Sequence, residues 1–142
     1  MKYFTINELT YSATANLKKI KNTPNGAIKK NLEILIEQLD KIREKYGKPI
    51  YINSGYRCPE LNAAIKGVST SQHQLGVAAD LDTRKGHAEN QKLYDLIAKY
   101  FDFDQLLWEN NGAWIHYSYW KEIHCGFHRT HPAAQSLQTA GA

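Results

Sequence analysis

The sequence contains little cysteine, no long apolar run and no cluster of basic residues, and each absence excludes a class of protein. Its two cysteines, Cys58 and Cys125, lie far apart and form no CxxC pattern, so two reduced thiols are expected and one disulfide is the unsupported alternative. No segment approaches the roughly 20 apolar residues that a membrane span requires. Residues 1–6 lack the apolar stretch of a signal peptide. The sequence therefore predicts a soluble protein that is synthesised in the cytoplasm without a signal peptide.

What is present is an ordinary globular composition with a mild basic excess. The chain has 142 residues, of which 42% are hydrophobic and 23% charged, and this length fits one domain with a sizeable core. Its 18 basic and 14 acidic residues give a net charge of +4, which favours an anionic partner such as a cell wall or nucleic acid without identifying one. No run of five or more Lys or Arg residues occurs, so we do not expect nucleic-acid binding.

Apolar residues recur at three- and four-residue steps in two segments, which predicts two long amphipathic helices. The first is expected over residues 27–46, where Gly47 and then Pro49 end it. Its apolar stripe comprises Ile28, Leu32, Leu35, Ile36, Leu39, Ile42 and Tyr46. The second is expected over residues 86–100, with a stripe of Ala88, Leu93, Leu96, Ile97 and Tyr100. Nearer the N-terminus, the expected core contacts are Phe4, Leu9, Leu17 and Ile20.

Two short strands are predicted at residues 50–54 and 76–82, with a short helix at 59–65 that begins at a proline. Side chains alternate between the two faces of a strand. In the second strand, one face therefore carries Ala78, Asp80 and Asp82, and the other carries Val77, Ala79 and Leu81.

Two further strand-like runs flank Asn111-Gly112 and predict a β-hairpin over residues 104–119. With Asn111-Gly112 as a two-residue turn, Asn110 pairs with Ala113 and Glu109 pairs with Trp114. One side then carries Gln105, Leu107, Glu109, Trp114, His116 and Ser118, and the other carries Asp104, Leu106, Trp108, Ala113, Ile115 and Tyr117. Diagonal neighbours on one face, such as Glu109 and His116, lie roughly 7–8 Å apart. A one-residue change in the turn would reverse the two sides.

The stretch from Ser71 to Asp80, together with the later His116, supplies the residue types of a metal site. His73 and His116 offer two imidazoles and Asp80 offers one carboxylate, which is a three-ligand set for a catalytic zinc with an open position for water. Taken singly, His73 is compatible with a surface histidine and His116 with a core histidine. Asp82 competes for the ligand role, although capping the following turn is its simpler role. A metal would also neutralise the Asp80 charge, which is otherwise costly to bury.

Three blocks in this order resemble the zinc D-alanyl-D-alanine carboxypeptidases: Ser54-Gly55-Tyr56-Arg57, Ser71-x-His73-x-x-Gly76-x-Ala78-x-Asp80, and Trp114-x-His116-x-Ser118. This family of peptidoglycan peptidases also includes D-Ala-D-Ala dipeptidases and L-alanyl-D-glutamate endolysins. The resemblance implies an α+β fold, in which one compact domain has a central antiparallel sheet with helices packed against it. It also implies one zinc ion (Zn²⁺) held by His73, Asp80 and His116.

The resemblance further implies how the substrate is held. Arg57 resembles the family arginine that meets a substrate carboxylate or backbone carbonyl, and Ser71 resembles the serine near the metal that contacts substrate. Trp114 is expected to form a wall of the substrate site and part of the core. The departure concerns the general base, because family members carry Asp or Glu three residues before the second histidine, where this chain has Ala113. We assign the base to Glu109, the nearest carboxylate, which the hairpin register points at the site.

Simpler roles stay open for some of these residues. Arg57 could instead pair with a surface acid, and Ser71 could be a helix N-cap or a turn residue. Gln105 fits a structural role as well as a contact with the site. His87 is expected on the exposed surface.

The function implied by the resemblance is zinc-dependent hydrolysis of a peptide bond in the peptidoglycan stem peptide, most simply D-Ala-D-Ala, by a monomer. The alternative is a non-catalytic, zinc-stabilised module that binds the cell wall. The peptidase domain is expected over residues 1–122 and a mobile C-terminal tail over 123–142, where the run from His124 to His128 matches no zinc-finger spacing. Action on the cell wall would then require release from the cytoplasm, for which a holin-type route is the family analogy.

Overall fold

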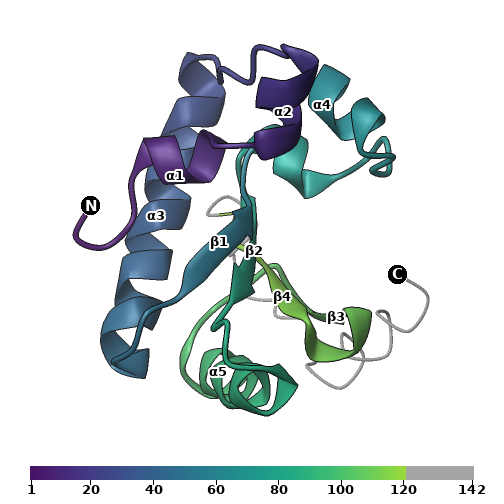
Figure 1. Ribbon diagram of the computed structural model, residues 1–142. Helices are drawn as coiled ribbons and strands as arrows, with labels where there is room; N and C mark the ends of the chain where they lie inside the picture. Colours follow the sequence, from purple (N-terminus) through teal and green to yellow (C-terminus); the bar gives the residue numbers. More distant parts are fainter. Residues whose placement is uncertain (121–142) are drawn as a thin grey trace.

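A four-stranded antiparallel sheet organises residues 1–120, the part of the chain that the computed structural model describes (Figure 1). Its strands lie in the order β1-β2-β4-β3. The bounds are Tyr51–Ser54 for β1, Ala78–Asp82 for β2, Gln105–Glu109 for β3 and Trp114–Ser118 for β4. The predicted α+β class with a central antiparallel sheet is therefore confirmed. Within the same residues, no helix combines the length and the apolar character needed to cross a membrane.

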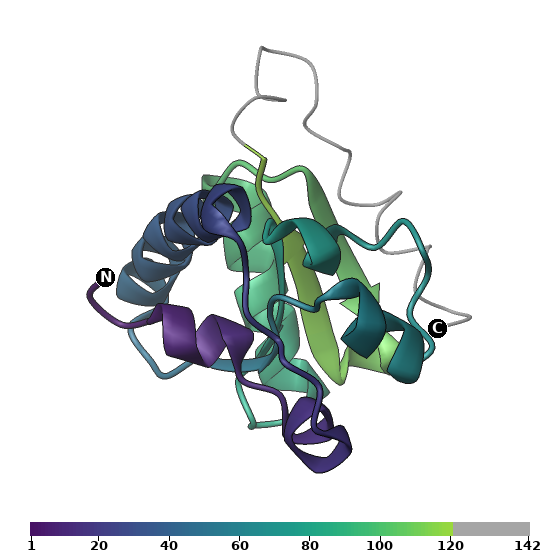
Figure 2. The same cartoon turned by 90° about the horizontal axis from the view of Figure 1, so that it is seen from above.

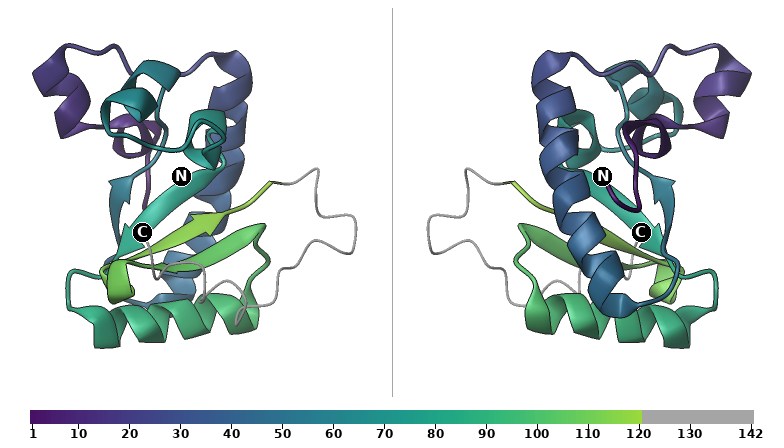
Figure 3. Two further views of the ribbon diagram at one scale, coloured as in Figure 1. Left: turned by 90° about the vertical axis from the view of Figure 1, so that its right-hand side faces the viewer. Right: turned by 90° about the vertical axis from the view of Figure 1, so that its left-hand side faces the viewer.

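Five α-helices and two short 3₁₀-helices surround the sheet in residues 1–120. They are α1 (Ile6–Thr10), α2 (Ala13–Lys18), α3 (Gly26–Tyr46), α4 (Pro59–Ala64), η1 (Gln72–Leu75), α5 (His87–Tyr100) and η2 (Asn110–Gly112). Figure 2 shows α3 and α5 on one side of the sheet and α4 and η1 on the other. The two opposite views in Figure 3 show α3 first behind the sheet and then in front of it. One face of the sheet is thus covered by long helices, and the other is left to short elements.

The core lies between the sheet and the two long helices. From α3 it takes the predicted stripe residues Leu32, Leu35, Ile36, Leu39 and Ile42, and from the sheet it takes Ala79, Leu81, Leu106, Ile115 and Tyr117. The bounds of α3 agree with the prediction to within one residue, because the Asn25 side chain caps its first turn and Gly47 ends it in a left-handed conformation.

Two of the predicted core contacts are wrong. Leu17 is 85% exposed, because α2 is a six-residue surface helix that buries only Ala15. Tyr100 is 53% exposed at the last position of α5, where the Lys45 ammonium lies 4.2 Å from the centre of its ring.

The apolar stripe of α5 also differs from the predicted one. Ala88 is exposed and Leu96 only half-buried, whereas Leu93 and Ile97 are buried as expected. The helix instead buries Tyr94, whose ring meets Trp108 edge-on at 5.8 Å, and the polar Asn90. Asn90 is buried because it forms hydrogen bonds to Thr83 and Gly112, and an apolar period cannot detect such contacts.

The turn between β3 and β4 is longer than predicted, although the register agrees. Residues 110–112 all have positive φ angles, which Asn and Gly tolerate, and the Ala113 amide donates to the Glu109 carbonyl at 3.1 Å. Asn110 and Ala113 therefore belong to a four-residue turn and do not pair as strand residues. Because the turn takes one residue from the end of each strand, Glu109 still pairs with Trp114 as predicted.

Candidate metal centre and cleft

The strand pairing sets four residues side by side across the sheet. Ser54 pairs with Asp80, Asp80 with His116, and His116 with Leu107. Their neighbours along β2 and β4, such as Leu81, are buried under the long helices, so this row occupies the opposite face. The predicted side assignment for Asp80 and His116 is therefore confirmed.

The third candidate ligand, His73, comes from η1 and is buried with 3% of its surface exposed. The helix begins at Ser71, whose hydroxyl accepts from the His73 amide at 3.2 Å, and it ends at Gly76 with φ +73°. A Cβ atom at Gly76 would lie 2.8 Å from the Ile28 side chain. Both the positive φ angle and this close approach therefore favour glycine at the position. The sharp end of η1 leads the chain directly into β2.

The loop after β1 forms hydrogen bonds to the His73 ring and backbone. The carbonyl oxygen of Gly55 lies 2.7 Å from Nδ1 of His73, and the Arg57 amide donates to the His73 carbonyl at 3.1 Å. A carbonyl can only accept, so Nδ1 carries the proton and the lone pair of Nε2 faces the site. A Cβ atom at Gly55 would lie 2.2 Å from the Leu9 carbonyl oxygen, which explains glycine at that position.

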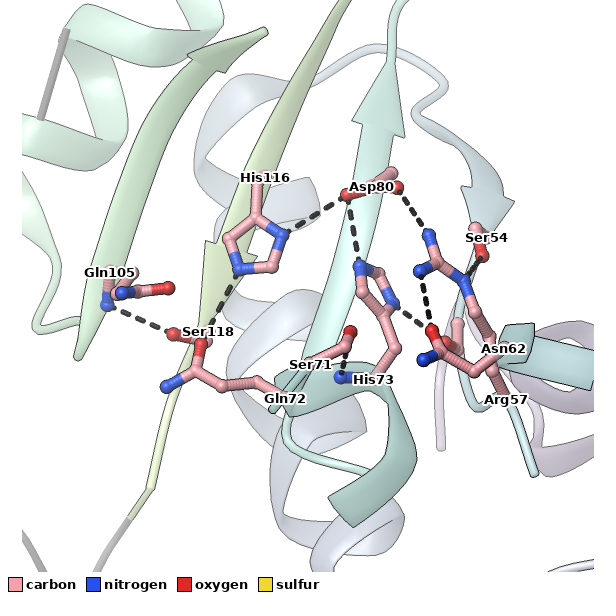
Figure 4. A network of polar contacts seen from close by, with 11 residues as sticks. Ser54, Arg57, Asn62, Ser71, Gln72, His73, Asp80, Gln105, His116 and Ser118 are labelled. Carbon is pink, nitrogen blue, oxygen red and sulfur yellow. Dashed lines mark hydrogen bonds and ion pairs between the residues drawn. The ribbon is translucent and has the colours of Figure 1, made fainter. Parts of the chain in front are cut away.

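Three ligand atoms meet where these elements converge (Figure 4). Nε2 of His73 lies 3.3 Å and Nδ1 of His116 lies 3.2 Å from the same oxygen, Oδ1 of Asp80. All three atoms lie within 4.8 Å of one another, and no other group of this kind occurs in residues 1–120. Two imidazole nitrogens and one carboxylate oxygen at this spacing suit a tetrahedral zinc ion with its fourth position open. The residues present therefore fit the implied metal.

The electrostatics of Asp80 favour a cation at this point. Burial by itself would raise the pKa of its carboxyl group, but the neighbouring His73 and His116 outweigh burial and hold that pKa well below its usual range. The side chain is thus an anion that is only 10% exposed. A buried carboxylate needs compensation, which a metal ion or a paired cation supplies.

Arg57 lies against the other oxygen of Asp80. Its Nη2 atom is 3.4 Å from Oδ2 of Asp80, its Nε donates to the Ser54 hydroxyl at 3.0 Å, and its Nη1 donates to Oδ1 of Asn62 at 3.3 Å. Burial lowers the pKa of the guanidinium and the Asp80 carboxylate opposes that shift. Arg57 does pair with an acid, as the simpler alternative held, but the acid is a buried candidate ligand and not a surface residue.

A cleft of about 340 Å³ opens in front of these groups. Its walls include every site residue predicted from the sequence: Arg57, Ser71, His73, Asp80, Glu109, Trp114 and His116. Gln105, for which two roles were open, also lines it. Leu107, predicted on this side of the hairpin, lines it as well, and the residues that the sequence did not single out are Val68, Thr70 and Gln72. Of these, Gln72 could have been suspected only from its position between Ser71 and His73 in the motif.

Glu109 stands on the cleft wall at the end of β3. Burial raises the pKa of its carboxyl group; the nearby His116 lowers it and Asp80 raises it further. A raised pKa is the kind of shift that general bases of enzymes show. Its strand partner Trp114 lines the same wall, whereas Ala113 lies in the turn outside the cleft.

Three simpler interpretations are confirmed by the structure. Ser71 is the N-cap of η1 in addition to lining the cleft. Oδ1 of Asp82 accepts from the Arg84 amide at 2.9 Å and so caps the turn after β2. His87 is exposed at the start of α5.

One predicted side is wrong. Asp104 was placed on the side away from the cleft, yet its carboxylate accepts a hydrogen bond from the amide of Gln72, which lines the cleft. The alternation of sides begins only at Gln105, the first residue of β3, so it does not extend to Asp104. The run from His124 to His128 and the predicted tail at 123–142 lie outside the described residues.

Comparison with known proteins gives a match to one family. Residues 2–118 match the family described as Peptidase M15. The matched range spans most of the chain and contains all of the candidate site residues. No curated protein matches the chain.

Proposed function

Because the chain belongs to the peptidase M15 family, we propose that it hydrolyses a peptide bond of the peptidoglycan stem peptide, most simply D-Ala-D-Ala. The observation that carries the proposal is the convergence of His73, Asp80 and His116 on one point of a cleft that Glu109 also lines. Family membership supports a zinc-dependent metallopeptidase, and the choice of bond is our proposal.

The three ligands would hold a single zinc ion on the cleft floor. When bound, zinc supplies Lewis acidity, which polarises a carbonyl group and makes water acidic enough to react near neutral pH. Asp80 contributes the one negative charge of the set. His73 presents Nε2 because its Nδ1 donates a hydrogen bond to the Gly55 carbonyl.

Glu109 would serve as the general base and then as the general acid. It takes a proton from the attacking water, whose oxygen forms the new bond to the carbonyl carbon. It returns that proton to the amine nitrogen as the carbon–nitrogen bond breaks, so the products are a carboxylate and a free amine. The raised pKa of Glu109 suits this exchange, since a proton held at a higher pKa is taken up more readily.

The remaining cleft residues would hold the peptide. Arg57 reaches the cleft beside Asp80, where its guanidinium group can meet a substrate carbonyl or carboxylate. Ser71 and Trp114 also line the cleft and would contribute a hydroxyl group and an apolar wall. In this proposal, the partner is peptidoglycan and the domain at 1–122 binds it as a monomer. A holin-type release would bring the protein to the cell wall.

A second candidate function is a zinc-stabilised module that binds the cell wall without catalysis. The exposed Ala113, at the position where the family carries a carboxylate, favours it. Structural zinc sites are normally closed by four protein ligands, and three converge in residues 1–120, which favours catalysis.

The test is digestion of purified peptidoglycan, with the zinc content of the protein measured alongside and the products identified by mass spectrometry. Released fragments that disappear with a chelator and return with zinc support the proposal, and their masses name the bond. Zinc-loaded protein that binds the walls and releases no fragment would overturn it in favour of the binding module.

A further inference from the structure

Gln72 and Asp104 form a hydrogen-bonded pair behind His116, on the side away from the other candidate ligands. The Gln72 amide donates to Oδ2 of Asp104, and Oε1 of Gln72 lies 3.4 Å from Nε2 of His116. Figure 4 shows the Gln72 side chain reaching the His116 ring from η1, opposite the edge that meets Asp80. The two nitrogens of His116 therefore have different neighbours.

The chemistry of the three groups determines the direction of each hydrogen bond. A carboxylate can only accept, so Gln72 must turn its NH₂ group toward Asp104. Its carbonyl oxygen then faces His116, and it can accept a proton from Nε2 but cannot donate one. With the proton on Nε2, the lone pair of Nδ1 is free to face Asp80 and a metal ion.

Without the Gln72 oxygen as an acceptor, the imidazole proton of His116 can lie on Nδ1 instead of Nε2. Nδ1 lies 3.2 Å from Oδ1 of Asp80, so a proton on Nδ1 would be donated to that carboxylate. A metal ion would then have to displace it before binding. The same problem does not arise at His73, because the Gly55 carbonyl holds the proton of its Nδ1 through the backbone.

We infer that Gln72, held by Asp104, is a positioning residue that keeps His116 in the form that binds metal through Nδ1. The inference rests on the proposed function for the identity of the metal. A metal ion on Nδ1 makes the Nε2–H a stronger donor, which strengthens the long contact to Gln72 when the site is filled. Removal of such an outer partner typically weakens metal binding by about 10- to 100-fold.

The decisive measurement is zinc affinity, determined by competition with a chelator in the absence of substrate. Gln72→Met, which keeps the length and removes both hydrogen bonds, should bind zinc about 10- to 100-fold more weakly than the natural chain. The matched control is Gln74→Met on the same short helix, because the Gln74 amide donates to the Ser69 carbonyl at 2.9 Å and does not line the cleft. That variant should keep the natural affinity, and thermal unfolding of the metal-free proteins should be alike.

Two further variants separate positioning from simple packing. Gln72→Glu still offers an acceptor to Nε2, so it should bind zinc more tightly than Gln72→Met. Asp104→Ala should lose less affinity than Gln72→Met and add nothing to it in the double variant, because Asp104 acts on His116 by orienting the Gln72 amide.

Zinc affinity in Gln72→Met equal to that of Gln74→Met would overturn the inference, as would additive losses in the double variant. A change confined to the Michaelis constant would also overturn it, because Gln72 would then contact substrate instead. Failure of the proposed function looks different: the natural chain would show the expected pattern of zinc affinities and still release no peptide.

Discussion

The Nη2 atom of Arg57 lies 3.4 Å from Oδ2 of Asp80, while Oδ1 of the same carboxylate faces both candidate histidine ligands. The carboxylate is thus shared between a permanent cation and the place where a metal ion would bind. Both side chains are largely buried, at 14% and 10% exposed. Removal of one partner would therefore leave the other charge buried with less compensation in the metal-free protein.

We predict that Arg57→Met destabilises the metal-free protein by about 3 kcal/mol, because it removes the cation beside Oδ2 of the buried Asp80 carboxylate. Zinc should restore part of this loss by supplying positive charge to Asp80. Urea unfolding with and without a chelator measures both effects. The matched control is Arg84→Met at an exposed position, which should cost less than about 1 kcal/mol. Equal losses in the two variants would show that the Arg57–Asp80 pair has no special role.

Removal of a ligand should abolish stabilisation by zinc. Zinc at 100 times its dissociation constant should stabilise the natural chain by about 2.7 kcal/mol through mass action. In His73→Ala the same zinc concentration should leave the melting temperature unchanged and peptidoglycan hydrolysis should be lost. His87→Ala, on the exposed surface, should behave as the natural chain does. Retained zinc stabilisation in His73→Ala would remove this residue from the ligand set.

Glu109→Gln should keep zinc and lose turnover. The amide cannot accept the proton of the attacking water, so kcat should fall by about 10²- to 10⁴-fold while zinc affinity changes little. Steady-state kinetics and metal analysis on the same sample test this. Glu33→Gln, an exposed glutamate of α3, is the matched control. A Glu109→Gln variant with natural kcat would place the base elsewhere.

The surface of α3 and α5 provides a prediction about pH. Glu89 accepts from the Tyr46 hydroxyl and lies 3.2 Å from the Lys48 ammonium, and these partners lower the pKa of its carboxyl group to about 2. A depressed folded-state pKa adds stability that is complete above the ordinary glutamate pKa and is lost as pH falls toward 2. The stability difference between the natural chain and Glu89→Gln should therefore shrink between about pH 4.5 and 2.

Thermal unfolding of chelator-treated proteins across this pH range measures the effect. In a Tyr46→Phe background the pH-dependent part should be smaller, because the Tyr46 hydroxyl is the strongest single partner of Glu89. A stability difference that stays constant from neutral pH to pH 3 would contradict the prediction.

Features that follow from local periodicity could be predicted from the sequence. The 3.6-residue period located α3 to within one residue, and the two-residue period placed Asp80, Glu109 and His116 on the side that became the cleft. The hairpin register followed from the position of Asn111-Gly112, even though the turn itself is longer. These features depend on residues that are close in sequence, so the amino-acid sequence alone was enough to predict them.

Features that depend on distant partners could not be predicted. Asn90 is polar and was left out of the α5 stripe, yet it is buried because its amide donates to the Gly112 carbonyl at 2.8 Å and its oxygen accepts from the Thr83 amide at 2.9 Å. Asp104 reaches Gln72 across 32 residues of sequence. No period in either segment encodes such a contact, since the partner belongs to another element.

The four-residue turn at 110–113 has a consequence for changes in loop length. A strand that slips by two residues along its partner keeps its side chains on the same faces, and one that slips by a single residue exchanges them. Insertion of a single residue that shifts one strand would bring buried residues such as Leu106 or Ile115 to the cleft and carry Glu109 or His116 into the core. The register of this hairpin therefore decides whether the site residues face the cleft or the core.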